Sequence, residues 1–207
     1  MGGFLNHKRI WWGMGVIGVV TAVLLLVAPE EATLGAGIRS VYVHVALIWV
    51  GLAGFVIAGL LGVGLLVTGY ERLYLWLRTI GWMGVGFFAA GMATSALASQ
   101  VNWGAVFWQE PRMRSSSTSL TIAVIVLVAI DWFPWLRLKG ALVTAVPLIF
   151  FWLTARTELV LHPDNPILTS DSVGIQATFA GLFVLVGLAA ALLVWRGVKR
   201  EKIEESK

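Results

Sequence analysis

The sequence predicts an all-α fold: a polytopic membrane bundle of six transmembrane helices with both termini in the cytoplasm. Composition is the first reason, because 58% of the 207 residues are hydrophobic and only 13% are charged, whereas a soluble domain carries about 25% charged residues. The second is a mean hydropathy of +0.86. The third is the recurrence of apolar stretches long enough to cross a bilayer. Together these observations exclude a water-soluble globular enzyme and a disordered chain.

Six stretches reach or approach the length of about 20 apolar residues that a membrane-spanning helix needs. They are Trp11–Ala28, Val41–Val67, Thr79–Ser99, Ser116–Leu136, Leu138–Ala155 and Val173–Trp195. The fourth is weaker because Asp131 and Pro134 lie near its end, and the fifth is short and carries Pro147, which should kink it. Pro29 and Glu30 directly after the first stretch argue against signal-peptide cleavage there. We expect residues 1–207 to form a single membrane domain.

The distribution of basic residues predicts the orientation, because Lys and Arg favour the cytoplasmic side of a membrane. Eleven lie at the termini and in the second and fourth loops: Lys8, Arg9, Arg72, Arg78, Arg137, Lys139, Arg196, Lys199, Arg200, Lys202 and Lys207. The other side has four: Arg39, Arg112, Arg114 and Arg156. Loops one, three and five should therefore face outward from a bacterial or archaeal cytoplasmic membrane. The net charge of +4 is then a topology signal, and no nucleic-acid partner is expected.

Several kinds of chemistry are absent from the sequence. The chain has no Cys, which excludes disulfides, thiolate metal sites and Cys nucleophiles. It also lacks P-loop, HExxH and GxSxG motifs, which argues against phosphoryl transfer and hydrolysis. The spans hold almost no ionisable residue, and this argues against a pump or coupled transporter. We expect no catalytic residue on this chain.

The candidate site lies on the predicted outer face. Of the three His, His44 and His162 fall on that side at similar depth, while His7 falls on the opposite side. Taken alone, His44 fits an interfacial packing residue and His162 an ordinary polar loop residue. Most Trp fit an interfacial belt: Trp11, Trp12, Trp76, Trp82, Trp132, Trp135 and Trp195 all map to the cytoplasmic side.

Trp103 and Trp108 are harder to assign to a belt, because they share the third loop with Phe107, Glu110 and two Arg. Haem is a flat apolar ring with two carboxylates and an iron that accepts imidazole. Aromatic side chains can cover the ring, and Arg can pair with the propionates. Two His on one side, an aromatic shelf and Arg39, Arg112 and Arg114 therefore supply the parts of a site for one haem.

At these residues the chain resembles the haem-handling cytochrome c assembly family, the tryptophan-rich WWD membrane proteins of the CcmC and CcsA type. Trp103, Gly104, Glu110 and Arg112 match the spacing of the family's WGxxWxWDxR stretch, with Glu in place of Asp. Pro111 matches its WDP variant. The segments Tyr42-Val43-His44-Val45 and Leu161-His162-Pro163 are similar to its YxHV and LHxP segments. Phe107 and Gln109 stand where the family usually has Trp, and Trp108 is displaced by one position.

The resemblance implies a protein that binds haem b at its outer face and presents it for cytochrome c maturation. His44 and His162 would be the axial ligands of the iron. Trp103, Phe107 and Trp108 would form the shelf, and Arg112 with Arg39 or Arg114 would hold the propionates. The motif residues Gly104 and Glu110 would complete the binding segment. Implied partners are a periplasmic haem chaperone, ABC-type transporter subunits of a maturation complex, and membrane lipid.

Two alternatives remain open. In the first, the chain is a subunit of a haem lyase that attaches haem to apocytochrome. Lyases of this family tend to carry further spans and a large outer domain, for which 207 residues leave no room. In the second, the chain is a cofactor-free permease or structural subunit, and an absorbance spectrum of the purified protein separates that reading from the other two.

Overall fold

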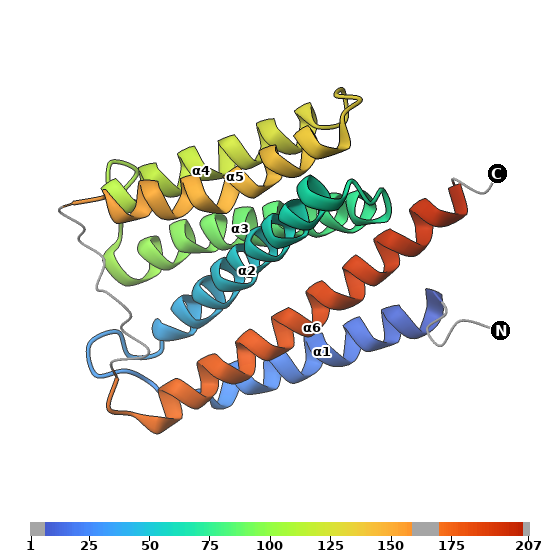
Figure 1. Ribbon diagram of the computed structural model, residues 1–207. Helices are drawn as coiled ribbons and strands as arrows, with labels where there is room; N and C mark the ends of the chain where they lie inside the picture. The colour runs from blue at the N-terminus through green and yellow to red at the C-terminus, as the bar shows by residue number, and fades with distance from the viewer. Residues whose placement is uncertain (1–6, 159–169, 205–207) are drawn as a thin grey trace.

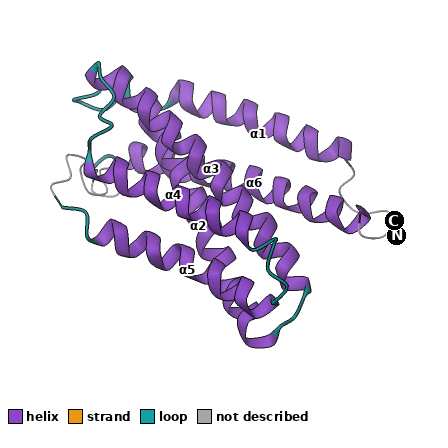
Figure 2. Ribbon diagram, turned by 90° about the horizontal axis from the view of Figure 1, so that it is seen from above, coloured by secondary structure: helices purple, strands orange, loops and turns teal. Residues whose placement is uncertain are grey.

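The structure, a computed structural model, describes residues 7–158 and 170–204. In those ranges it contains six α-helices and no β-sheet, only an isolated bridge between Glu31 and Gly35 (Figures 1 and 2). The helices are α1 (His7–Val27), α2 (Ile38–Thr68), α3 (Arg72–Trp103), α4 (Pro111–Ala129), α5 (Leu136–Ala155) and α6 (Val173–Glu204). The predicted all-α class is confirmed.

Five of these six described helices are long and apolar enough to cross a membrane: α1, α2, α3, α5 and α6. The exception, α4, occupies Pro111–Ala129, so it begins and ends earlier than the expected stretch Ser116–Leu136. The first half of α4 is polar, because it carries Arg112, Arg114 and the hydroxyl residues 115–119. Asp131 and Pro134, which the sequence placed inside the span, lie in the connection to α5.

The helices also shorten the third loop. Because α3 continues to Trp103 and α4 begins at Pro111, the connection between them is residues 104–110 rather than 100–115. α5 continues through Pro147. The pyrrolidine ring of Pro147 fits against Gly59 of α2, where an added Cβ would lie 2.7 Å from the Pro147 Cγ atom.

α2 and α3 pack antiparallel at the centre of the molecule, and glycines set their separation. A Cβ on Gly51 would lie 2.6 Å from the backbone nitrogen of Phe88, and a Cβ on Gly54 would lie 2.9 Å from the Cα of Gly84. Gly62 meets α5 instead, since its Cβ would lie 2.7 Å from the Gly140 carbonyl oxygen. Small residues thus let three helix backbones approach closely, as in other membrane bundles.

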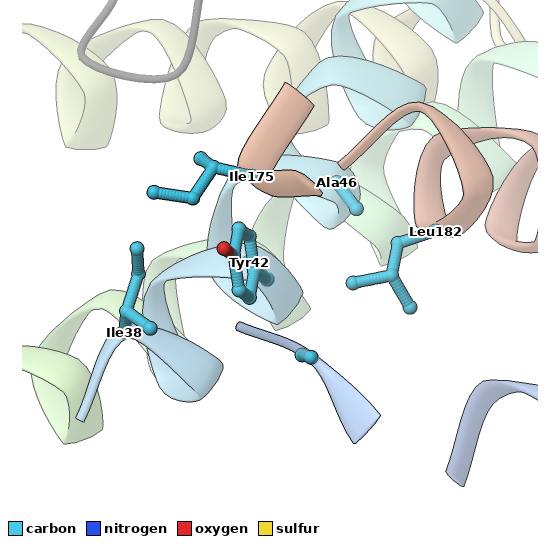
Figure 3. Close-up of a cluster of buried hydrophobic side chains, with 6 residues drawn as sticks. Ile38, Tyr42, Ala46, Ile175 and Leu182 are labelled. Carbon is cyan, nitrogen blue, oxygen red and sulfur yellow. The ribbon is translucent and has the colours of Figure 1, made fainter. Parts of the chain in front are cut away.

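α1 lies at the edge of the bundle, alongside α6 (Figure 1). A buried cluster joins these helices to the start of α2 and includes Ile38, Tyr42, Ala46, Ile175 and Leu182 (Figure 3). Tyr42 is fully buried, and its hydroxyl donates a hydrogen bond of 3.4 Å to the Pro29 carbonyl. This contact holds the connection between α1 and α2 against the bundle.

The connections divide between two ends of the molecule (Figure 1). The terminal end contains the start of α1, the end of α6, the turn 69–71 and the connection 130–135. The loop end contains the connections 28–37 and 104–110, the end of α5 and the start of α6. The described helices therefore alternate in direction along the bundle.

Candidate functional site

His44 is half-buried in the second turn of α2 and faces α3. Its Nδ1 atom lies 2.8 Å from the carbonyl oxygen of Gly91. A carbonyl oxygen only accepts hydrogen bonds, so Nδ1 is the donor and carries the proton. In the neutral ring the lone pair is then on Nε2, the atom that histidine ligands commonly offer to a metal.

The length of α2 places His44 near an interface. The helix has 31 residues, which corresponds to about 46 Å and exceeds the hydrocarbon thickness of about 30 Å. Counting about 20 residues back from Val67 reaches Ile48. His44 lies one helical turn beyond Ile48, toward the loop end.

The aromatic segment begins at the end of α3. Trp103 is the last residue of that helix, and Gly104 ends it with a left-handed backbone at φ 71°, a conformation that favours glycine. The Gly104 N–H donates to the Gln100 carbonyl, and the Gln100 side chain donates back to the Gly104 carbonyl, both at 3.0 Å. Trp103, Phe107 and Trp108 are 56%, 44% and 65% exposed, so they present apolar surface at the loop end.

Asn102 ties this segment to the start of α2. Its side-chain amide donates to the Ala98 carbonyl at 2.8 Å, and to the Gly37 carbonyl and the Ser40 hydroxyl at 3.3 Å. The aromatic segment therefore starts beside the first turn of the helix that carries His44. Sequence reasoning did not single out Asn102, because two of its partners, Gly37 and Ser40, lie more than 60 positions away.

Glu110 and Pro111 form the start of α4. One carboxylate oxygen of Glu110, Oε2, accepts a 2.8 Å hydrogen bond from the Met113 N–H, and Pro111 occupies the first turn. This is an ordinary helix cap, and it accounts structurally for the Glu-Pro pair. The other oxygen, Oε1, is buried with no hydrogen-bond partner in the described part of the chain. Arg112 is half-buried and Arg114 exposed in the first turn that follows.

Arg39 lies in the first turn of α2. Its Nη2 atom is 4.0 Å from a carboxylate oxygen of Glu30, and its side chain is 38% exposed. The Nε atom of Arg39 is buried and has no hydrogen-bond partner within residues 7–158 and 170–204. A guanidinium with an unused donor and a weak ion pair is suited to bind an anionic group.

His162 lies outside the described residues, as do Leu161 and Pro163. The helices on either side of it, α5 and α6, respectively end and begin at the loop end. His7 begins α1 at the terminal end, which is opposite to His44, as expected. Within the described ranges no three His, Asp or Glu side chains gather into a metal-binding cluster.

A second polar cluster, at the terminal end, was not anticipated from the sequence. Arg78 of α3 makes a two-pronged ion pair with Asp131 at 2.8 Å for each contact, and a third contact of 3.0 Å with Glu201 of α6. The Tyr74 hydroxyl also donates to Asp131, and the Lys139 ammonium lies 4.0 Å from the centre of the Tyr74 ring. The hydrogen bonds from Arg78 hold the pKa of the Asp131 carboxyl below its usual value.

No family model and no curated protein matches this chain.

Proposed function

We propose that this protein binds haem at the loop end, which faces outward, and hands the haem on as cargo for cytochrome c maturation. The observation that carries the proposal is the hydrogen bond from His44 Nδ1 to the Gly91 carbonyl. Histidines that ligate metals almost always donate their other ring N–H in this way, which fixes both the tautomer and the ring orientation.

The residues present fit the chemistry of haem. His44 and His162 would each supply a ring nitrogen as a ligand to the iron. Trp103, Phe107 and Trp108 offer exposed aromatic surface to the porphyrin. Arg39, whose buried Nε has no hydrogen-bond partner among the described residues, is suited to a propionate, as are Arg112 and Arg114 of the first turn of α4. Haem b, bound without thioether links, is the form consistent with a chain that has no Cys.

A six-span topology is part of the proposal, although α4 is too polar to qualify by hydropathy. α3 ends at the loop end and α5 starts at the terminal end, so the chain must return between them through α4. The 19 residues of α4 cover about 28 Å. Its hydroxyls donate to carbonyls one turn back, which lowers the cost of placing them in lipid; the donors are Ser115, Ser117, Thr118, Ser119 and Thr121.

The motif resemblance suggests the setting. A periplasmic haem chaperone would receive the haem, and ABC-type transporter subunits would complete the maturation complex. Membrane lipid covers the exposed apolar helices, and the host membrane is the cytoplasmic membrane of a bacterium or archaeon.

The test uses the full-length protein purified in detergent and titrated with haem. We expect a Soret band in the wild type and a loss of at least tenfold in haem affinity in His44→Ala and His162→Ala. His7→Ala is the matched control, since His7 begins α1 at the opposite end, and it should bind haem like the wild type.

Two results would overturn the proposal. A wild-type protein that shows no Soret band after haem addition would favour the cofactor-free alternative. A loss of haem binding in His7→Ala, with binding retained in His44→Ala, would show that haem binds at the terminal end of the bundle and not at the loop end.

A further inference from the structure

The carbonyl oxygen of Gly91 accepts hydrogen bonds from two side chains. His44 Nδ1 donates to it at 2.8 Å, across the α2–α3 interface, and Thr94 Oγ1 donates to it at 3.0 Å, from the next turn of α3. Thr94 Oγ1 also lies 3.0 Å from the Ala90 carbonyl. Since a hydroxyl has one proton, Thr94 divides its donor capacity between two carbonyls.

Gly91 can be in this position because it has no side chain. An added Cβ would lie 2.8 Å from Ile48 Cγ1 and 2.9 Å from both the Cδ1 and the backbone nitrogen of Ile48. Contacts that short with the backbone of α2 would force the two helices apart. The glycine therefore brings its own carbonyl within reach of the His44 ring.

Building on the proposed haem site, we propose that Gly91 and Thr94 are positioning residues for His44. Gly91 holds the imidazole with Nδ1 protonated and Nε2 as the ligand atom. Thr94 takes up part of the acceptor capacity of the Gly91 carbonyl. The hydrogen bond to His44 is weaker as a result, and the imidazole would donate less electron density to iron than it would without the Thr94 hydroxyl.

The first arm of the test uses haem-free protein labelled with ¹⁵N in its three His. Two-bond ¹H–¹⁵N spectra report which ring nitrogen carries the proton, and a His44→Ala spectrum assigns the signals. We expect the Nδ1–H tautomer for His44 in the wild type and its loss or mixing in Gly91→Ala. The Nε2–H tautomer in the wild type would overturn the proposal, whether or not the protein binds haem.

Gly84→Ala is the matched control for Gly91→Ala. Gly84 also lies in the α2–α3 interface, where an added Cβ would be 3.1 Å from the Gly51 carbonyl oxygen and the Phe55 ring. Gly84→Ala therefore disturbs the α2–α3 packing but leaves the Gly91 carbonyl, which accepts the hydrogen bond from His44, unchanged. Equal loss of the Nδ1–H signal in both variants would reduce the role of Gly91 to packing and overturn this part of the proposal.

Thr94 is tested without changing the backbone. In haem-free Thr94→Val the Nδ1 proton of His44 should move downfield, because the remaining hydrogen bond to Gly91 strengthens. Thr94→Ser, which keeps the hydroxyl, should match the wild type. An unchanged proton shift in Thr94→Val would overturn the role of Thr94.

The second arm uses haem-loaded protein. We expect a more negative reduction potential in Thr94→Val than in Thr94→Ser, and a haem affinity in Gly91→Ala lower by about 10–100-fold, the range for a partner of a metal-ligating His. Equal potentials in the two Thr94 variants would contradict the proposed tuning. A wild type with the Nδ1–H tautomer that fails to bind haem would instead reject the proposed function and leave the hydrogen-bond assignment standing.

Discussion

Arg78 joins three separate parts of the terminal end through one guanidinium. It lies on α3, and its partners Asp131 and Glu201 lie 53 and 123 positions further along the chain. The group is partly exposed, with 31% of the Arg78 side chain accessible, so each ion pair contributes modestly. The two-pronged geometry and the additional Tyr74 contact make the cluster stronger than a single surface pair.

The Asp131 carboxyl makes stability depend on pH in a defined direction. Its pKa is depressed in the folded protein, chiefly by the hydrogen bonds from Arg78. The stabilisation is therefore complete above the unfolded pKa of about 3.9 and is lost as the pH falls through the lower folded value. We expect the wild-type thermal midpoint to fall on acidification through this window, and Asp131→Asn to have a lower midpoint at pH 7.

The difference in thermal midpoint between the wild type and Asp131→Asn reports the contribution of Asp131 alone. Glu31 also has a lowered pKa, because its carboxylate accepts hydrogen bonds from the Leu34 and Thr33 N–H groups. That contribution is common to both proteins. A gap in midpoint that stayed constant from pH 7 to below the window would contradict the assignment.

Among the helices, α2 packs closely against two others, α3 and α5. Its face with Gly51 and Gly54 fits α3, whereas its face with Gly59 and Gly62 fits α5. Such contacts depend on the absence of a side chain, so the same substitution should have opposite consequences at a packed and at an open glycine.

Gly51→Ala and Gly86→Ala form a matched pair for this idea. A Cβ at Gly51 would lie 2.6 Å from Phe88 N, while a Cβ at Gly86 would meet nothing within 4 Å. We expect Gly51→Ala to lose about 1–3 kcal/mol by overpacking, and Gly86→Ala to be neutral or to gain up to about 1 kcal/mol from helix propensity. Reversible unfolding in detergent measures both, and similar losses in the two variants would refute the packing account.

At the scale of the whole molecule, the two ends differ in chemistry. The terminal end has the Arg78 ion-pair cluster. Cation–π contacts with Trp rings occur at both ends: Arg196 with Trp11 at 4.7 Å and Lys199 with Trp195 at 5.4 Å at the terminal end, and Arg156 with Trp152 at 4.6 Å at the loop end. Amphipathic aromatic rings paired with basic groups are typical of an interfacial belt. The loop end carries His44 together with the exposed rings of Trp103, Phe107 and Trp108, the residues of the proposed haem site.

The absence of Cys allows a direct test of this polarity with single-Cys variants. In intact cells, a membrane-impermeant maleimide should label Ala32→Cys and Ala105→Cys at the loop end. Glu71→Cys and Trp132→Cys at the terminal end should react only after permeabilisation. Labelling of Trp132→Cys from outside would mean that α4 does not cross the membrane, and labelling of Glu71→Cys from outside would invert the whole topology.

Much of the fold could be predicted from residue order, but the site could be predicted only in outline. Long apolar runs and the placement of Lys and Arg are local properties, so they predict the helices and the shared end of the two termini. The limits of α4 differ from the predicted stretch Ser116–Leu136, because Glu110 caps the helix at the Met113 N–H and hydropathy does not register such a cap. Hydropathy likewise predicts one long loop that contains both Trp103 and Trp108, whereas Trp103 ends α3.

The sequence by itself determined that this is a helical protein suited to a membrane, with His44 near the end opposite to its termini, because hydropathy and charge act through composition and spacing. Only the tertiary structure decided that the Gly91 carbonyl accepts a hydrogen bond from His44, 47 positions away. It likewise decided that Asn102 joins the end of α3 to the start of α2, and that Arg78 binds both Asp131 and Glu201. These pairings depend on how closely two helix backbones approach and in what register, and neither is encoded in a local pattern.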